Sequence, residues 1–229
     1  MVGHSSLASD SSIGHAERVV VAASFERDVV LTDGSVLAVR PVRPEDRARL
    51  HRLHDQDLSD TSAYYRFFGL RPHLTSTFLD RLVRFEPLSQ VTIVAERDGR
   101  IVGAGSYNKE TSDSVEVAFA VADDFHGQGI GTVLLEDLAV LARECGFRRL
   151  VAHTLPGNRP MLDVFARVGL TMRHHLEDGI VDIEIDLSDE ASFLQSADER
   201  EWANQARSMQ PFIAPASVVV IGAGREPAS

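Results

Sequence analysis

The stretch Val115-Glu-Val-Ala-Phe-Ala-Val121 is followed, after four residues, by His126-Gly-Gln-Gly-Ile-Gly131. In the first segment apolar side chains occupy alternate positions, which predicts a β-strand with one buried face. Ile130 then starts an apolar stripe with helical spacing that runs to Cys145, and Gly146 ends the helix. The sequence therefore predicts a strand, a glycine-rich turn and a helix, whose first N–H groups have no partner within the helix and can bind an anion.

Further strands and helices are predicted on both sides of this unit. Asp98-Gly99 is a dipeptide that favours a tight hairpin turn. Thr75 is a suitable N-cap for a helix. The predicted strands are 36–43, 91–96, 101–107, 115–121, 150–155 and 181–187, and further helices run from Glu45 to about Leu58, after Thr75, and from Pro160 to Gly169. We interpret the element order as β-α-α-β-β-β-α-β-α-β-β.

Composition excludes several classes of protein. The 229 residues have a formal net charge of −11 and a pI near 5.2, which argues against nucleic acid as a partner and favours a cationic one such as a lysine or amine. The single cysteine, Cys145, excludes an internal disulfide framework and falls on the apolar stripe, where we expect a buried thiol. No apolar stretch is long enough to span a membrane, and no secretory signal begins the chain, so we expect a cytoplasmic protein.

The chain is expected to have four parts. We predict a disordered leader over 1–28, a main domain over 29–190, a linker or surface helix over 191–212, and a last segment over 213–229. In the last segment the apolar run 217–221 precedes Gly-Ala-Gly, as in the first strand and turn of a nucleotide-binding unit. It is either an added edge strand or the start of a second domain.

The glycine-rich turn resembles the cofactor signature of the GNAT superfamily of acetyltransferases, Val-x-x-x-x-[Gln/Arg]-x-x-Gly-x-Gly. Val121, His126, Gly129 and Gly131 match its spacing, although His126 replaces the usual Gln or Arg. A second motif of that family, in which an Asn follows a strand and a helix ends at Gly-Phe, resembles the segment from Asn158 to Gly169-Leu170. The resemblance covers about residues 35–187.

This resemblance implies an α/β (α+β) fold, the GNAT fold, with a mixed, mostly antiparallel sheet and helices on both faces. It also implies acetyl-CoA as cosubstrate, bound at the end of strand 115–121, in the glycine-rich turn and along the helix after Asn158. The implied contact residues are Phe119, Ala120, Val121, His126, Gly127, Gln128, Gly129, Ile130, Gly131, Thr132, Asn158 and Phe165.

Three of the implied assignments stay open. His126 is either a phosphate contact or a solvated loop residue. Asn158, next to Gly157, is either a cofactor contact or an ordinary turn residue. Phe165 stands where many relatives have a Tyr that protonates the leaving thiolate, and a phenyl ring cannot donate that proton.

Glu116 is the candidate general base. Acetyl transfer needs a neutral amine, and at pH 7 only about one lysine in 2,500 is neutral, a deficit of about 4.6 kcal/mol. Glu116 shares a strand face with Ala118 and Ala120, which leave space beside the carboxylate. In the family's lysine acetyltransferases a Glu on this strand is the base. The alternative is an outward-facing carboxylate paired with Lys or Arg.

Metal binding is not predicted. His51 and His54, and the adjacent His174 and His175, have no Cys or acidic partner at a zinc-site spacing, so we interpret them as surface residues.

A closer resemblance concerns Ser62-Ala-Tyr-Tyr-Arg66-Phe67-Phe68, which is similar to a Ser-x-x-x-Arg-Phe-Phe signature of bacterial protein lysine acetyltransferases of the Pat type. Those proteins join a GNAT domain to an acyl-CoA synthetase-like domain, whose opening the segment 213–229 resembles. This implies a protein substrate, an acyl-CoA synthetase that acetylation silences. The alternatives are a small-amine N-acetyltransferase and an acetyl-CoA-sensing domain without catalysis.

Overall fold

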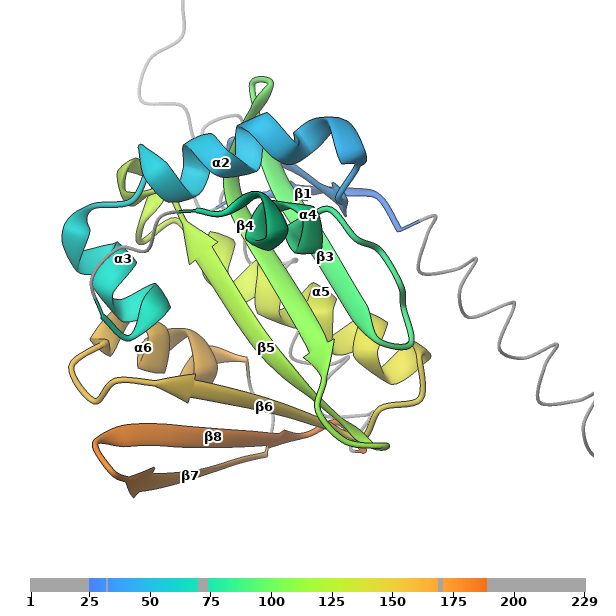
Figure 1. The fold of residues 1–229 in the computed structure, drawn as a ribbon, viewed down its shortest axis with the longest axis vertical. Coiled ribbons are helices and arrows are strands. Elements are labelled where there is room, and N and C mark those ends of the chain that lie inside the picture. Colours follow the sequence, from blue (N-terminus) through green and yellow to red (C-terminus); the bar gives the residue numbers. More distant parts are fainter. Residues whose placement is uncertain (1–24, 32, 70–73, 169–170, 189–229) are drawn as a thin grey trace, which may run out of the picture.

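The structure is a computed structural model that describes residues 25–31, 33–69, 74–168 and 171–188 (Figure 1). The predicted linker at 191–212, the segment 213–229, Gly169-Leu170 and most of the predicted leader lie outside the described residues. Strand β1 begins at Arg27, so the sheet starts within the range assigned to the leader.

An eight-stranded sheet has the order β1-β2-β3-β4-β5-β6-β8-β7. Every neighbouring pair is antiparallel except β5 and β6, which confirms the mixed, mostly antiparallel sheet. The predicted order includes a strand before 181–187 without locating its residues, which are those of β7, and it lacks β1. The strands are β1 (Arg27–Val30), β2 (Val36–Pro41), β3 (Gln90–Arg97), β4 (Arg100–Lys109), β5 (Ser114–Val121), β6 (Arg149–Thr154), β7 (Met172–Glu177) and β8 (Ile180–Asp186).

Helices cover both faces of the sheet, as predicted. Figure 1 shows α2 and α4 in front of the central strands and α5 behind them. One apolar cluster lies between the sheet and α5, and a smaller one lies under α2 and α4. The helices are α2 (Arg47–Asp55), α3 (Asp60–Phe67), α4 (Ser76–Leu82), α5 (Ile130–Glu144) and α6 (Arg159–Arg167), with short 3-10 turns at Pro44–Asp46 and Asp123–Phe125.

Local signals in the sequence determine several element ends. The Thr75 hydroxyl accepts a hydrogen bond from the Phe78 N–H at 3.2 Å and caps α4. Asp98 and Gly99 have φ of 51° and 76° and connect β3 to β4 in a tight hairpin. Cys145 is buried at the end of α5, as expected for a residue on its apolar stripe.

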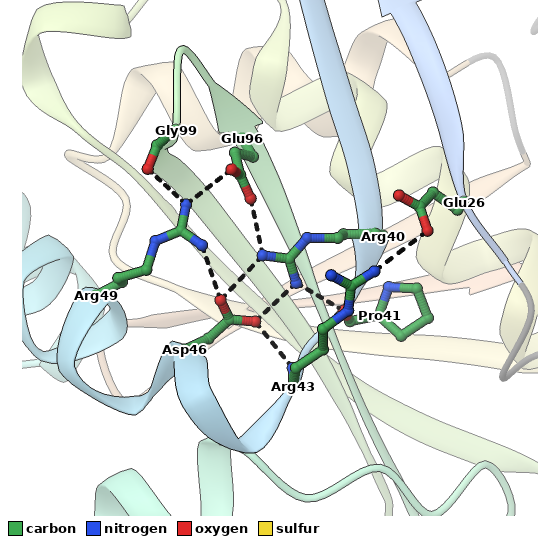
Figure 2. Close-up of polar contacts among 8 residues, drawn as sticks. All are labelled: Glu26, Arg40, Pro41, Arg43, Asp46, Arg49, Glu96 and Gly99. Atoms are coloured by element: carbon green, nitrogen blue, oxygen red, sulfur yellow. Dashed lines mark hydrogen bonds and ion pairs between the residues drawn. The ribbon is translucent and has the colours of Figure 1, made fainter.

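A partly buried group of charges joins β2, the start of α2 and β3 (Figure 2). The Arg40 guanidinium donates two hydrogen bonds to Asp46, at 2.7 and 2.9 Å, and one to Glu96 at 2.8 Å. Arg49 bridges the same two carboxylates, each at 3.0 Å. Burial raises the pKa of Asp46, but the hydrogen bonds from Arg40 and from the Arg43 N–H, together with the charges of Arg40 and Arg49, hold this pKa below its usual value. We name Arg40, Asp46, Arg49 and Glu96 the charge cluster.

The interpretation of His54 as a surface residue is wrong. His54 is 2% exposed, its Nδ1 lies 2.9 Å from the Leu50 carbonyl, and its ring packs against Phe67 and Phe78. The helical spacing that places His54 on the apolar face of α2 together with Leu50 and Leu53 was the signal that this interpretation overlooked.

Candidate functional site

Strands β5 and β6 pair over only three residues and then separate. Their parallel register runs from Ser114↔Arg149 to Glu116↔Val151, and Figure 1 shows the two strands diverging beyond it. The Ala122 N–H donates to the Val102 carbonyl at 2.8 Å, so the even-numbered residues of β5 bond to β4. By that alternation the backbone groups of Val117, Phe119 and Val121 face the side that β6 has left, and those of Ala120 do not.

The start of α5 lies beside the open edge of β5. Gly129 caps the helix with φ of 90°, a left-handed conformation that favours glycine. The first backbone N–H in this turn with a backbone partner among the described residues is that of Val133, which donates to Gly129. The N–H groups from Gly127 to Thr132 therefore have no backbone acceptor there, as an anion site requires.

Gly131 has a different role from that of Gly129. A Cβ on Gly131 would lie 3.1 Å from a Val164 methyl carbon and 3.4 Å from the Phe119 ring. Its small size thus allows α5 to pack closely against α6 and β5. A Cβ on Gly129 would meet nothing within 4 Å. Glycine is therefore favoured at 129 by the positive φ and not by close packing, and the space around it is open to a ligand.

A cavity of about 490 Å³ joins the separated strands to the start of α5. It is lined by most of the predicted site residues, which come from β5, the glycine-rich turn, α5 and α6: Glu116, Phe119, Ala120, Val121, His126, Gly127, Gly129, Ile130, Gly131, Thr132 and Asn158. The fold thus brings together residues that are distant in sequence. Within the described part of the chain, no group of three or more His, Cys, Asp or Glu residues could hold a metal ion.

Two predicted contact residues do not line the cavity. Phe165 is 2% exposed and packs in the core, with its ring centroid 6.0 Å from that of Phe119. The apolar face of α6 turns toward α5 and the sheet, and Phe165 belongs to that face. Gln128 points toward Arg97 and the Asp124 carbonyl, with contacts of 3.4 Å to each.

His126 and Asn158 both bond to the protein's own backbone. The His126 Nε2 lies 2.9 Å from the Val121 carbonyl, which places the proton on Nε2 and ties the turn to the end of β5. The Asn158 Oδ1 accepts from the Met161 N–H at 3.3 Å and caps α6. Both residues therefore shape the cavity wall through backbone contacts.

Glu116 lies in this cavity with an exposed carboxylate. Its Cα faces Asn108 on one side and Val151 on the other, at the last residue pair before β5 and β6 separate. Among the described residues it forms no hydrogen bond and no ion pair within 4 Å.

Arg66, from α3, carries a charge that interacts with that of Glu116. The Arg66 Nε is buried and has no hydrogen-bond partner among the described residues, and the side chain lines the cavity. Burial lowers the pKa of Arg66, and the charge of Glu116 partly offsets this. The neighbouring Tyr65 hydroxyl donates to the Gly157 carbonyl at 3.0 Å and ties α3 to the loop before α6. The sequence motif drew attention to this segment but not to the position of Arg66 in the cavity.

His153 is a cavity residue that sequence reasoning missed. It lies on β6 opposite Asp182 of β8, and its Nδ1 is 2.6 Å from the Asp182 carboxylate. No local pattern marks either residue, because they become neighbours only through the pairing of strands 29 positions apart.

Comparison with known proteins gives a consistent result. Residues 50–170 match the Acetyltransferase (GNAT) family. An acetyltransferase of Pseudomonas aeruginosa is 30% identical over 176 residues, 73% of this chain and 94% of the relative. The acetyltransferase Pat of Mycolicibacterium smegmatis is 29% identical over 164 residues, 69% of this chain, and the match spans about half (48%) of Pat.

Solved structures agree with this assignment. The GNAT domain of S. lividans PAT has a TM-score of 0.67 and 36% identity over 70% of this chain and 96% of that domain. The yncA protein of Salmonella typhimurium, solved with its cofactor acetyl-CoA, shares the fold, with a TM-score of 0.57 and 19% identity over 69% of this chain and 97% of that protein. The chain belongs to the acetyltransferase (GNAT) family, whose cosubstrate is acetyl-CoA.

Proposed function

We propose that this chain acetylates a lysine side chain of a protein, with Glu116 as the general base. The observation that carries the proposal is the position of Glu116: an exposed carboxylate without a hydrogen bond or ion pair among the described residues, in the cavity where β5 and β6 separate. A carboxylate held by a partner would be less able to accept a proton from an incoming ammonium group.

The groups beside Glu116 suit an acyl-CoA. The free N–H groups from Gly127 to Thr132 are suited to hold the pyrophosphate, because they concentrate donors at the positive end of α5. The backbone edge of Phe119 and the Val121 N–H are suited to hold the pantetheine arm, while the Val121 carbonyl is occupied by His126. The N–H groups of Phe119 and Val121 can also stabilise the negative charge that develops on the thioester oxygen.

Resemblance to Pat-type enzymes supports a protein substrate. The Ser62 to Phe68 segment matches their signature, and its Arg66 lies in the cavity beside Glu116. We infer that an acyl-CoA synthetase is the protein acetylated, as the resemblance implies. The net charge of −11 favours the approach of a cationic lysine.

The test compares Glu116→Gln with Glu184→Gln, which changes a half-exposed carboxylate on the same sheet face that pairs with Arg149 and does not line the cavity. Each protein is incubated with acetyl-CoA and a panel of acyl-CoA synthetases, and acetyl-lysine is located by mass spectrometry. We expect Glu116→Gln to lower turnover by about 10² to 10⁴-fold with acetyl-CoA affinity unchanged, and Glu184→Gln to match the wild type.

Two results would contradict the proposal. Wild-type acetylation of small amines but of no protein lysine would overturn the protein substrate. Near-normal turnover of Glu116→Gln at pH 7 would overturn the role of Glu116, and a loss of both acetyl-CoA binding and thermal stability would make Glu116 a structural residue.

A further inference from the structure

His153, held by Asp182, can supply the acid that a Tyr at position 165 would supply in many relatives. Transfer of the acetyl group leaves a thiolate on CoA, and Phe165 cannot protonate it, because a phenyl ring carries no acidic proton and this ring is buried in the core. His153 lines the cavity, and its Nδ1 is held by the Asp182 carboxylate. Its other ring nitrogen, Nε2, has no hydrogen bond among the described residues.

Strand register places His153 on the same side of the sheet as Glu116. Glu116 and Val151 are direct partners in the parallel pair of β5 and β6, so their side chains share a face. His153 follows Val151 by two residues in β6 and therefore lies on that face too, just past the point where the strands separate. Glu116 and His153 thus lie on the two diverging strands with the cavity between them.

The contact with Asp182 orients the imidazole. Nδ1 lies 2.6 Å from the Asp182 carboxylate, a short contact typical of a charge-assisted hydrogen bond with Nδ1–H as donor. In the imidazolium form of the ring the second nitrogen, Nε2, also carries a proton. Both side chains are half-exposed, at 37% and 42%, so water can restore the proton after each turnover.

We propose that His153 is a catalytic acid that gives its Nε2 proton to the sulfur of the departing CoA, and that Asp182 positions it. The inference rests on the proposed acetyl transfer. Glu116 first takes a proton from the ammonium group and releases it to water; the neutral amine then forms the N–C bond, the C–S bond breaks, and its electron pair goes to sulfur. Glu116 takes one proton from the amine nitrogen, His153 gives one to sulfur and becomes neutral, and exchange with water restores both groups.

The test uses His153→Asn. The amide N–H of Asn can replace Nδ1–H toward Asp182, but Asn has no counterpart of Nε2. His175→Asn is the matched control, since His175 lies opposite Asp182 on the other side of β8 and does not line the cavity. We expect His153→Asn to lower turnover with acetyl-CoA by about tenfold to hundredfold and His175→Asn to have no effect.

The acyl donor separates an acid from a structural residue. A donor whose leaving thiol is strongly acidic, such as acetyl thionitrobenzoate, needs no protonation of its sulfur. With this donor we expect His153→Asn to react at most of the wild-type rate. A variant whose site is distorted would stay slow with both donors. Equal deficits with both donors, or no deficit with acetyl-CoA, would overturn the inference.

A binding measurement tests the same idea without turnover. The ultraviolet absorbance of the thiolate reports ionisation of the thiol of bound CoA, with desulfo-CoA as the blank. A neighbouring imidazolium lowers the pKa of a thiol, so we expect this pKa to be higher in His153→Asn than in the wild type and His175→Asn. An unchanged pKa would contradict the proposal. If the wild type transfers no acetyl group to any amine, the proposed function fails and this inference fails with it; if only the His153 results are negative, the proposed function stands.

Discussion

Two arginines with buried guanidinium atoms serve opposite purposes in this molecule. Arg40 donates to Asp46 and Glu96 within the charge cluster, and each carboxylate has a second cation in Arg49 (Figure 2). Arg66 has a buried Nε without a hydrogen-bond partner among the described residues and lines the cavity. A satisfied cluster holds elements together, whereas a buried donor left without an acceptor is a cost to the fold that a bound ligand can remove.

The largest expected effect contrasts these two arginines directly. Arg40→Met leaves Asp46, which is 1% exposed, without its main partner, and we expect the free energy of unfolding to fall by about 3 to 5 kcal/mol. Arg66→Met removes an unsatisfied donor, so we expect a change of about 1 kcal/mol or less. Urea unfolding of the two variants measures both values. Equal losses would show that Arg66 is as structural as Arg40.

His54 sharpens the contrast because it is an ionisable group buried on the inner face of α2. Burial, with a smaller contribution from the charge of Arg66, lowers the pKa of His54 to about 4. Below pH 6.5 the unfolded chain binds a proton on His54 that the folded chain binds only near pH 4, so acid favours unfolding. We expect the free energy of unfolding to fall by up to about 3 kcal/mol as the pH drops from 7 to 4.

The pH dependence has its own controls. His54→Leu should remove this slope, and Arg66→Met should reduce it. His51→Leu, on the same helix, should change it less than Arg66→Met does, because the charge of His51 makes the smallest contribution. Urea unfolding at intervals between pH 7 and 4 tests this, and a slope that survives in His54→Leu would assign the effect to other groups.

The glycine-rich turn tests the cavity side of the comparison. Gly129→Glu places a bulky anion where the free N–H groups gather, and we expect the dissociation constant for acetyl-CoA to rise at least about 100-fold, or about 2.7 kcal/mol. Gly179→Glu is the control, since Gly179 also has positive φ (81°) and open space around its Cα but lies in the hairpin of β7 and β8. Calorimetry that found equal affinity in both variants would remove the assignment of the cofactor site.

The smallest expected effect concerns two buried threonines. Thr154 and Thr92 both have a buried Oγ1 without a hydrogen-bond partner among the described residues, but only Thr154 lines the cavity. Thr→Val at either position should leave the free energy of unfolding unchanged or raise it by up to about 1 kcal/mol. Only Thr154→Val should weaken acetyl-CoA binding, by a factor of about ten or less. Equal acetyl-CoA affinity in the two variants would show that the Thr154 hydroxyl contacts no ligand.

Much of the fold could be predicted from the sequence because the signals are local. Strand β5, the glycine-rich turn and α5 are consecutive, and their periodicity and glycines lie within about thirty residues. The caps and the hairpin at Asp98-Gly99 depend on neighbouring residues for the same reason. Strand β7 was not located from the sequence because all but its first residue are exposed, and apolar and polar side chains do not alternate along it.

What the sequence by itself determined is the family, the order of the main elements, the glycine-rich turn and the candidacy of Glu116, since each depends on residue types at short spacings. Only the tertiary structure decided that β5 and β6 separate after Glu116, that Arg66 lines the same cavity as that carboxylate, and that His153 meets Asp182. It also placed Phe165 in the core. The physical reason is that these contacts depend on strand register and helix packing between segments far apart in the chain, and no short-range spacing encodes them.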